Sequence, residues 1–112
     1  MELAVTTAGP VTILTINGRL DSNSSKELED QVMGLVTGGV SKLLMDFGGV
    51  DYINSSGLRV LLMAFQHLKK SGGKLHLCNI KDYMNEVFEI SGYTEIFSIF
   101  PGQAEALAAF PE

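Results

Sequence analysis

The sequence predicts an α/β fold for residues 1–112, with an N-terminal β-hairpin followed by right-handed βα units in a mixed, mainly parallel sheet flanked by helices. The first segments of the chain alternate apolar and polar residues as β-strands do. Later segments repeat their apolar residues at helical spacing and alternate with further strand patterns, which predicts βα crossovers and parallel neighbouring strands. The length of 112 residues suits one domain with one core.

The first half of the chain predicts a hairpin, a helix and a strand. The segments ELAVTT and VTILTINGRL alternate as strands, and Gly9-Pro10 forms the turn between them. Residues 21–39 then predict a helix that ends at Gly38-Gly39. Its apolar face consists of Leu28, Val32, Leu35 and Val36. The continuous apolar run SKLLMDF is typical of a strand that is covered on both faces.

The second half predicts three further helices and two strands. The first of these helices follows NSSG, ends at Ser71-Gly72-Gly73, and buries Leu58, Leu61, Leu62, Phe65 and Leu68. KLHLCNI is the next strand, and KDYMNEVFEISG is a shorter helix with Asp82 as its N-cap and Gly92 as its C-cap. EIFSIF predicts the last strand, and GQAEALAAF predicts a terminal helix.

Composition excludes several classes of function. The net charge is −5 and the Lys and Arg residues are scattered, so we expect neither nucleic acid nor an anionic membrane as a partner. The single cysteine, Cys78, cannot form an internal disulfide and is interpreted as a small buried residue. No apolar run is long enough to span a membrane and the N-terminus lacks a signal-peptide pattern, so we expect a cytoplasmic protein.

Polar segments follow three of the predicted parallel strands. They are NGRLDSNSS, DFGGVDYINSSG and CNIKD. Function in open α/β sheets gathers at the carboxyl ends of the strands, so these segments are expected to meet there.

The stretch NSSG, at the start of a helix, allows two interpretations. Either Asn54 or Ser55 caps the helix, because a side-chain oxygen there can accept a free N–H of the first turn. Alternatively, a serine hydroxyl accepts a phosphate, since the free N–H groups and the helix dipole favour an anion. One cap needs one such residue, whereas the stretch holds three.

Catalysis and metal binding find little support in the residues. The sequence has no Gly-x-Ser-x-Gly motif, and His67 and His76 are interpreted as ordinary surface or boundary residues. One cysteine and two distant histidines give no metal-ligand spacing, and Asp46 is interpreted as a hydrogen-bonding residue at a strand end. We therefore expect no enzyme activity, no cofactor and no metal.

The run MDFGGVDYINSSGLRVLL resembles the STAS domain, the fold of bacterial anti-sigma-factor antagonists. In that family an apolar strand ends in a pair such as Asp-Phe, and an Asp-Ser/Thr-Ser-Gly-Leu motif begins the following helix. NGRLDSNSSKELE is similar to the family's Gly-x-Leu-Asp segment. KKSGGKLHLCNI and VFEISGYTEIFSIF resemble its later segments, so the likeness covers nearly the whole chain.

The resemblance implies a phosphorylation switch at Ser55. A partner anti-sigma-factor serine kinase phosphorylates this position in the family, and a serine phosphatase reverses the modification. The dephosphorylated antagonist binds the kinase and frees its sigma factor. Ser56 and Gly57 would support the helix start beside Asn54, which replaces the aspartate of many members.

The partner-binding surface would include three charged residues around the acceptor, namely Asp21, Asp51 and Arg59. The alternative is a STAS module that builds a scaffold, or binds a small ligand, without being phosphorylated.

Overall fold

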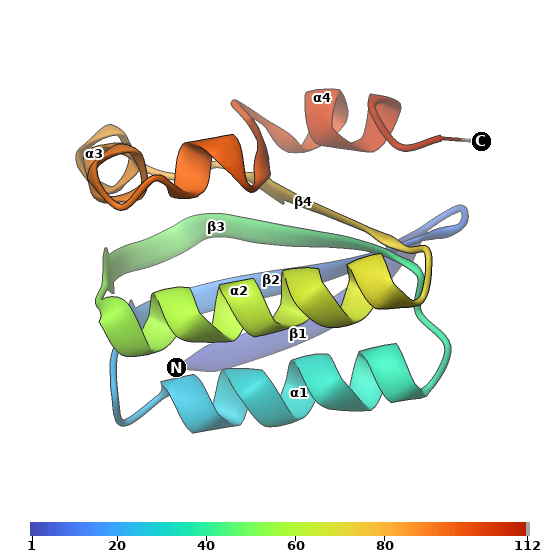
Figure 1. Cartoon of the computed structure of the whole chain (residues 1–112), viewed down its shortest axis with the longest axis horizontal. Coiled ribbons are helices and arrows are strands. Elements are labelled where there is room, and N and C mark those ends of the chain that lie inside the picture. The colour runs from blue at the N-terminus through green and yellow to red at the C-terminus, as the bar shows by residue number, and fades with distance from the viewer. Residues whose placement is uncertain (112) are drawn as a thin grey trace.

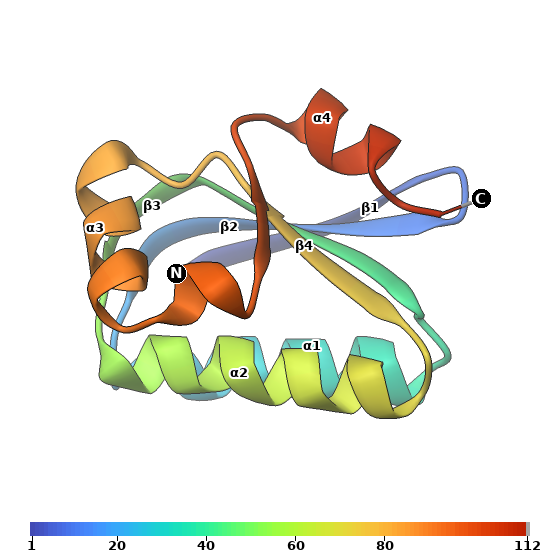
Figure 2. The ribbon, with the colours of Figure 1, turned by 45° about the horizontal axis from the view of Figure 1, so that its top comes forward.

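The polypeptide forms one five-stranded sheet with helices on both of its faces (Figures 1 and 2). The structure is a computed structural model that describes residues 1–111; Glu112, the last residue of the predicted domain range, lies outside the described residues. Strands β1 (Glu2–Ala8) and β2 (Val11–Leu20) pair antiparallel as the predicted hairpin. Strands β3 (Lys42–Ile53), β4 (Lys74–Cys78) and β5 (Ser98–Phe100) follow in the order β1-β2-β3-β4-β5, each parallel to its predecessor. The predicted α/β fold class is confirmed.

The helices divide between the two faces of the sheet. Helices α1 (Ser25–Thr37) and α2 (Ser55–Lys70) lie side by side on one face, and the short helix α4 (Gln103–Ala108) lies on the other (Figure 2). Helix α3 (Asp82–Ile90) and the 3₁₀ turn η1 (Tyr93–Glu95) lie at the end of the sheet where α1 and α2 begin (Figure 1). No helix within residues 1–111 is both long and apolar enough to cross a bilayer.

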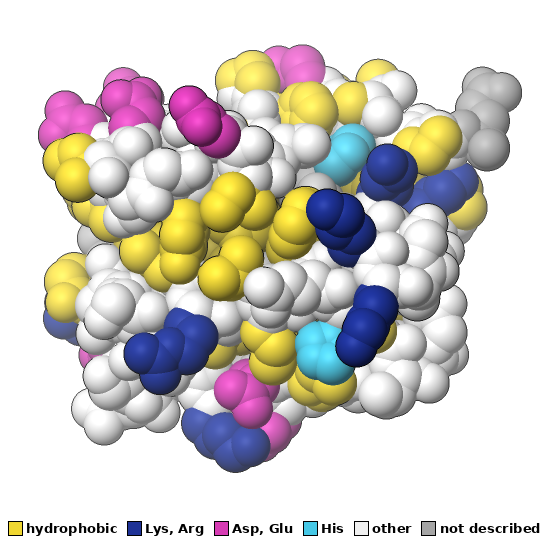
Figure 3. All heavy atoms as spheres, in the orientation of Figure 1, with side chains coloured by type: hydrophobic (Ala, Val, Ile, Leu, Met, Phe, Trp, Pro, Cys, Tyr) yellow, Lys and Arg dark blue, Asp and Glu magenta, His cyan; other side chains and the backbone are white. Residues whose placement is uncertain are grey.

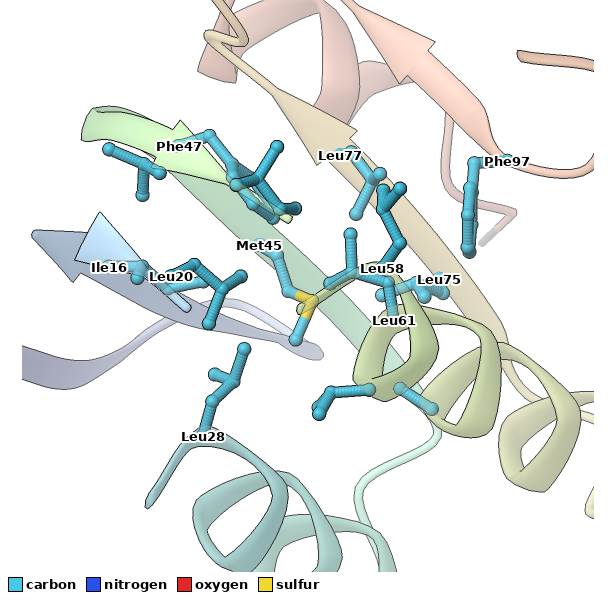
Figure 4. Packing of buried hydrophobic residues seen from close by; sticks show 14 of the residues in the cluster. Ile16, Leu20, Leu28, Met45, Phe47, Leu58, Leu61, Leu75, Leu77 and Phe97 are labelled. Carbon is cyan, nitrogen blue, oxygen red and sulfur yellow. The ribbon is translucent and has the colours of Figure 1, made fainter. Parts of the chain in front are cut away.

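Two apolar clusters hold these layers together. The larger joins the sheet to α1, α2 and α3, and Figure 4 shows Leu28 and Leu61 pointing from their helices toward Met45 of the central strand. The smaller packs α4 against the opposite face through Ala106 and Phe110. Strand β3 is covered on both faces as predicted, because Leu44 faces α4 while its neighbours Leu43 and Met45 face the larger cluster.

Several element ends differ from the sequence prediction. Strand β3 runs six residues beyond the predicted SKLLMDF, to Ile53, because register shifts in its pairing with β2 let the ladder continue. The N-cap of α3 is Lys81, so Asp82 is the first helical residue, and the C-cap is Ser91. Gly92 follows it in the left-handed conformation with φ of 77°, which starts η1 and shortens the predicted strand EIFSIF to Ser98–Phe100.

His76 was interpreted as a surface or boundary residue, and this was wrong. Its side chain is buried on β4 at 6% exposure. The ring stacks on Phe110 at 3.8 Å between centroids and lies 4.9 Å from the Phe100 ring, while the Ala106 carbonyl accepts a hydrogen bond from Nδ1 (3.0 Å). Helix α4 and Phe110 after it thus cover the His76 side chain, which would otherwise face solvent on this side of the sheet. Cys78 is buried as expected.

Candidate functional site

The first turn of α2 presents the NSSG stretch at the edge of the sheet. Asn54 is the one residue between β3 and α2, and its backbone N–H donates to the Leu20 carbonyl at the end of β2 (3.2 Å). Its side-chain Oδ1 accepts from the backbone N–H groups of Ser56 (3.1 Å) and Gly57 (3.3 Å). Asn54 is therefore the helix cap, and Ser55 is not needed for this role.

The two serines of the stretch have different surroundings. Ser55 is the first helical residue and is exposed, and within residues 1–111 its hydroxyl makes no hydrogen bond. Ser56 is half-buried, and its hydroxyl lies 3.2 Å from the Ser22 hydroxyl of the loop after β2. Of the two serines, Ser55 is the more exposed and has the hydroxyl without a partner among the described residues.

Gly57 lies against the sheet with no room for a side chain. A Cβ atom built at this position would stand 2.6 Å from Cγ of Leu20 and 3.0 Å from Cγ1 of Ile53. Both neighbours are buried ends of strands. Glycine at this position lets the first turn of α2 rest directly on the carboxyl ends of β2 and β3.

The loop after β2 is fixed by Asp21. Its Oδ1 accepts from the backbone N–H groups of Asn23 (3.0 Å) and Ser24 (3.2 Å), and its Oδ2 lies 3.6 Å from Nε of Arg19. Desolvation acts to raise the pKa of Asp21, but these hydrogen bonds and the Arg19 charge together hold it below its ordinary value. Arg19 also stacks over the Tyr52 ring, 4.1 Å from its centroid. These contacts tie the Asp21 loop to the ends of β2 and β3, beside the start of α2.

The segment after β4 joins the same edge at a different place. Lys81 Nζ donates to the carbonyls of Gly48 (2.9 Å) and Val50 (3.0 Å), and the Tyr83 hydroxyl donates to the Asp51 carbonyl (2.6 Å). The expectation that all three polar segments meet at the sheet edge is confirmed only in part. The loops at Asp21 and Ser55 touch through Ser22 and Ser56, whereas the third segment contacts β3 through Lys81, at Gly48 and Val50.

Two of the predicted charged residues lie four positions before and four positions after Ser55 in the chain. Asp51 and Arg59 are exposed, and Arg59 forms no ion pair in the part of the chain that the structure describes. Within residues 1–111, no cluster of three or more His, Cys, Asp or Glu residues is arranged to hold a metal.

Asp46 lies apart from this edge and makes the hydrogen bonds expected of it. Its carboxylate accepts from Gly48 N (2.9 Å), Asn79 Nδ2 (3.0 Å) and Gln103 Nε2 (2.9 Å). It ties β3 to the Asn79 turn and to α4.

Sequence reasoning missed three residues of the site region: Ser22, Tyr52 and Tyr83. Ser22 lies within the NGRLDSNSS segment, which is expected to reach the site. The sequence therefore indicates its position but does not reveal its contact with Ser56. Tyr52 lies within the DFGGVDYINSSG segment, which does not reveal its contact with Arg19, and Tyr83 lies outside the three polar segments. Their exposure, at 37% and 54%, is visible only in the folded chain.

Comparison with known proteins gives the family. The STAS domain model matches residues 2–106. BtrV of Bordetella bronchiseptica, which carries the name of an anti-sigma factor antagonist, is 36% identical over 98% of this chain and 95% of its own length. A Thermotoga maritima crystal structure with the same kind of name superposes with a TM-score of 0.91 at 20% identity, covering 95% of this chain and 92% of that one. The Bacillus protein SpoIIAA in its phosphorylated form superposes with a TM-score of 0.74 at 19% identity, over 96% and 97% of the two chains. The two superpositions show the fold, and the match to the family model over nearly all of its residues shows that the chain belongs to the STAS domain family of anti-sigma factor antagonists.

Proposed function

We propose that this chain is an anti-sigma-factor antagonist whose partner binding is switched by phosphorylation of Ser55. Unphosphorylated, it binds an anti-sigma-factor serine kinase and so releases a sigma factor; a serine phosphatase restores the unmodified form. In this role residues 1–112 act as one regulatory STAS domain and not as an enzyme. The observation that carries the proposal is the exposed Ser55 hydroxyl on the first turn of α2, beside an Asn54 that already supplies the cap.

Electrostatics favours a switch that leaves the fold intact. A phosphate adds roughly −1.5 to −2 charges and three strong acceptor oxygens. At the N-terminus of α2 this charge meets the positive end of the helix dipole, which contributes about 0.3–1 kcal/mol at an exposed position. The added charge projects into solvent and not into the core, because Ser55 is exposed.

The same phosphate opposes binding of a partner that covers Ser55. An interface shaped for a neutral hydroxyl would have to bury a bulky dianion, and an unpaired buried charge costs several kcal/mol. Each 1.4 kcal/mol changes affinity by about tenfold. Asp21 and Asp51 add negative charge nearby, and Arg19 is already engaged with Asp21 and Tyr52. Phosphorylation therefore weakens partner binding, because the phosphate would lose its hydration in the interface and is repelled by the carboxylates of Asp21 and Asp51.

The partner surface that we propose combines Asp21, Asp51 and Arg59 with the first turn of α2. All three residues lie on segments that border Ser55, and Asp51 and Arg59 are exposed. The neutral Asn54 keeps the helix cap without placing a carboxylate beside the acceptor hydroxyl.

Phosphosite mapping tests the proposal. The purified chain is incubated with ATP and an anti-sigma-factor serine kinase from the same genome, and its peptides are analysed by mass spectrometry. We expect phosphate on Ser55 in the unmodified sequence and in Ser56→Ala, and none in Ser55→Ala. Phosphate on Ser56 alone would move the switch by one residue. No phosphate, with a kinase shown to be active on another antagonist, would favour the unphosphorylated scaffold or ligand-binding module.

A further inference from the structure

A second surface lies away from Ser55, on the face drawn in Figure 3. Apolar side chains gather there between α2 and the η1–β5 segment (Figure 3). Phe97 is buried beneath this surface, and its ring lies 5.8 Å from the Phe65 ring and 5.6 Å from the Tyr93 ring. Ile96 is 37% exposed and Ile99 is half-exposed. We refer to Phe65, Tyr93, Ile96, Phe97 and Ile99 as the α2–β5 patch.

Positive charge borders one side of the α2–β5 patch. Residues 52–81 contain no Asp or Glu, although the chain as a whole has a net charge of −5. Lys69 Nζ lies 5.8 Å from the centre of the Phe65 ring, and both side chains line a hollow of about 180 Å³ together with Lys74. The basic border consists of the exposed residues Lys69, Lys70 and Lys74.

Negative charge borders the other side. Residues 82–95, which form α3 and η1, contain no Lys or Arg. Figure 3 shows acidic side chains over α3 and η1 on one side of the apolar surface and basic side chains toward the end of α2 on the other. The exposed acidic residues of this segment are Asp82, Glu86, Glu89 and Glu95, of which Glu95 directly precedes Ile96.

We propose that the α2–β5 patch binds a second copy of the chain in a symmetric dimer. The acidic border, the apolar patch and the basic border follow one another across this surface. Two copies related by a two-fold axis through the patch, at right angles to this direction, are therefore complementary. Such a rotation places the acidic border of each copy opposite the basic border of the other and buries apolar surface against apolar surface. An unrelated partner would have to supply this sequence of surfaces, whereas a second copy already carries it.

The proposed dimer leaves the switch accessible. Lys69 is 14 residues after Ser55 on the same helix, which at helical rise is about 21 Å along its axis. Phosphorylation of Ser55 and self-association through the α2–β5 patch are therefore separate events. The dimer presents two switch serines to kinase molecules.

Sedimentation velocity of the purified chain over a range of concentrations tests the dimer. We expect a species of twice the 12.1 kDa chain mass to grow with concentration. Ile96→Ser should weaken self-association by about tenfold or more, because an exposed apolar side chain of the patch is removed. Val5→Ser is the matched control, since Val5 is 43% exposed on the strand at the opposite edge of the sheet, and it should associate as the unmodified chain does.

Charge reversal tests the symmetry. Lys69→Glu and Glu95→Lys should each reduce self-association. In a symmetric dimer of either variant, residue 69 of each copy would face a residue 95 of the same charge. An equimolar mixture of the two variants should form a dimer again, since both contacts are then between opposite charges. A chain that stays monomeric at every concentration would overturn the proposal. So would a dimer that survives Ile96→Ser, or variants that fail to associate on mixing while retaining the thermal midpoint of the unmodified chain.

Discussion

The hydroxyl oxygens of Ser22 and Ser56 lie 3.2 Å apart and join two loops that are 34 residues apart in the sequence. This contact distinguishes the two serines that follow Asn54. Ser56 is directed toward the loop after β2, whereas Ser55 faces solvent one residue earlier on the same turn. The hydroxyl that contacts the loop and the hydroxyl that we propose to be phosphorylated are thus neighbours in the chain.

Ser55→Asp should mimic the phosphorylated state in part. A single carboxylate at the first helical position suits the helix dipole, so the thermal midpoint should stay within a few degrees of that of the unmodified chain. Kinase binding should weaken by about tenfold or more, because a charge enters the interface. Isothermal titration calorimetry would measure this, with Ser55→Ala expected to bind like the unmodified chain. Equal affinity of Ser55→Asp and Ser55→Ala would place Ser55 outside the interface.

Arg59→Glu should weaken kinase binding with little change in stability. Arg59 is exposed near the start of α2, on the turn that follows Ser55, and substitution of an exposed residue usually changes stability by less than about 0.5 kcal/mol. Lys42→Glu is the control, because it makes the same charge change at the start of β3, at the end of that strand remote from Ser55. If both variants lose affinity equally in titrations against the kinase, net charge and not Arg59 is responsible.

Gly57→Ala should destabilise the fold. The added methyl would meet Leu20 and Ile53, and overpacking of this kind costs about 1–3 kcal/mol. The control is Gly34→Ala on α1, where a Cβ meets nothing within 4 Å and where alanine should stabilise the helix by about 0.5–1 kcal/mol. Urea unfolding of both variants measures the two shifts, and a stabilised Gly57→Ala would show that the turn can move off the sheet.

Acid should destabilise the fold through His76. Desolvation lowers the pKa of His76, although the Ala106 carbonyl acts to raise it and nearby Lys74 lowers it further. Below a pH of about 6.5, His76 therefore binds a proton in the unfolded chain while it stays neutral in the folded chain. The contribution of neutral His76 to stability is fully present above this pH. It is lost as the pH falls from there toward the lower pKa of His76 in the folded state.

Thermal unfolding between pH 7 and pH 5 measures the contribution of His76. His76→Gln removes the titrating group while keeping an amide that can bond Ala106, so the slope of stability against pH should decrease. A slope in His76→Gln equal to that of the unmodified chain would assign the pH dependence to other groups.

The sheet and its two large helices could be predicted because their signals are local. Alternation in residues 11–20 and the spacing of Leu58, Leu61 and Leu68 indicate burial directly. The structure buries these three leucines and the apolar residues of the strand, whereas Leu62 and Phe65 of the predicted buried face are only half-buried. The order of strands and helices also predicts that the end of β2 lies beside the start of α2.

The remaining features depend on contacts between distant residues. The burial of His76 requires α4, a six-residue helix whose short pattern gave no indication of which strand it covers. The extension of β3 to Ile53 depends on register shifts opposite β2, which no alternation pattern reveals. The contact between Ser22 and Ser56 depends on a loop conformation that Asp21 sets through backbone hydrogen bonds.

The single residue between β3 and α2 has a kinetic consequence. Asn54 alone turns the chain, and its N–H and its side chain are both hydrogen-bonded. Under the proposed function, we therefore expect a partner that covers Ser55 to bind without ordering a loop at the start of α2. We then expect phosphorylation of Ser55 to change the dissociation rate of the complex more than its association rate.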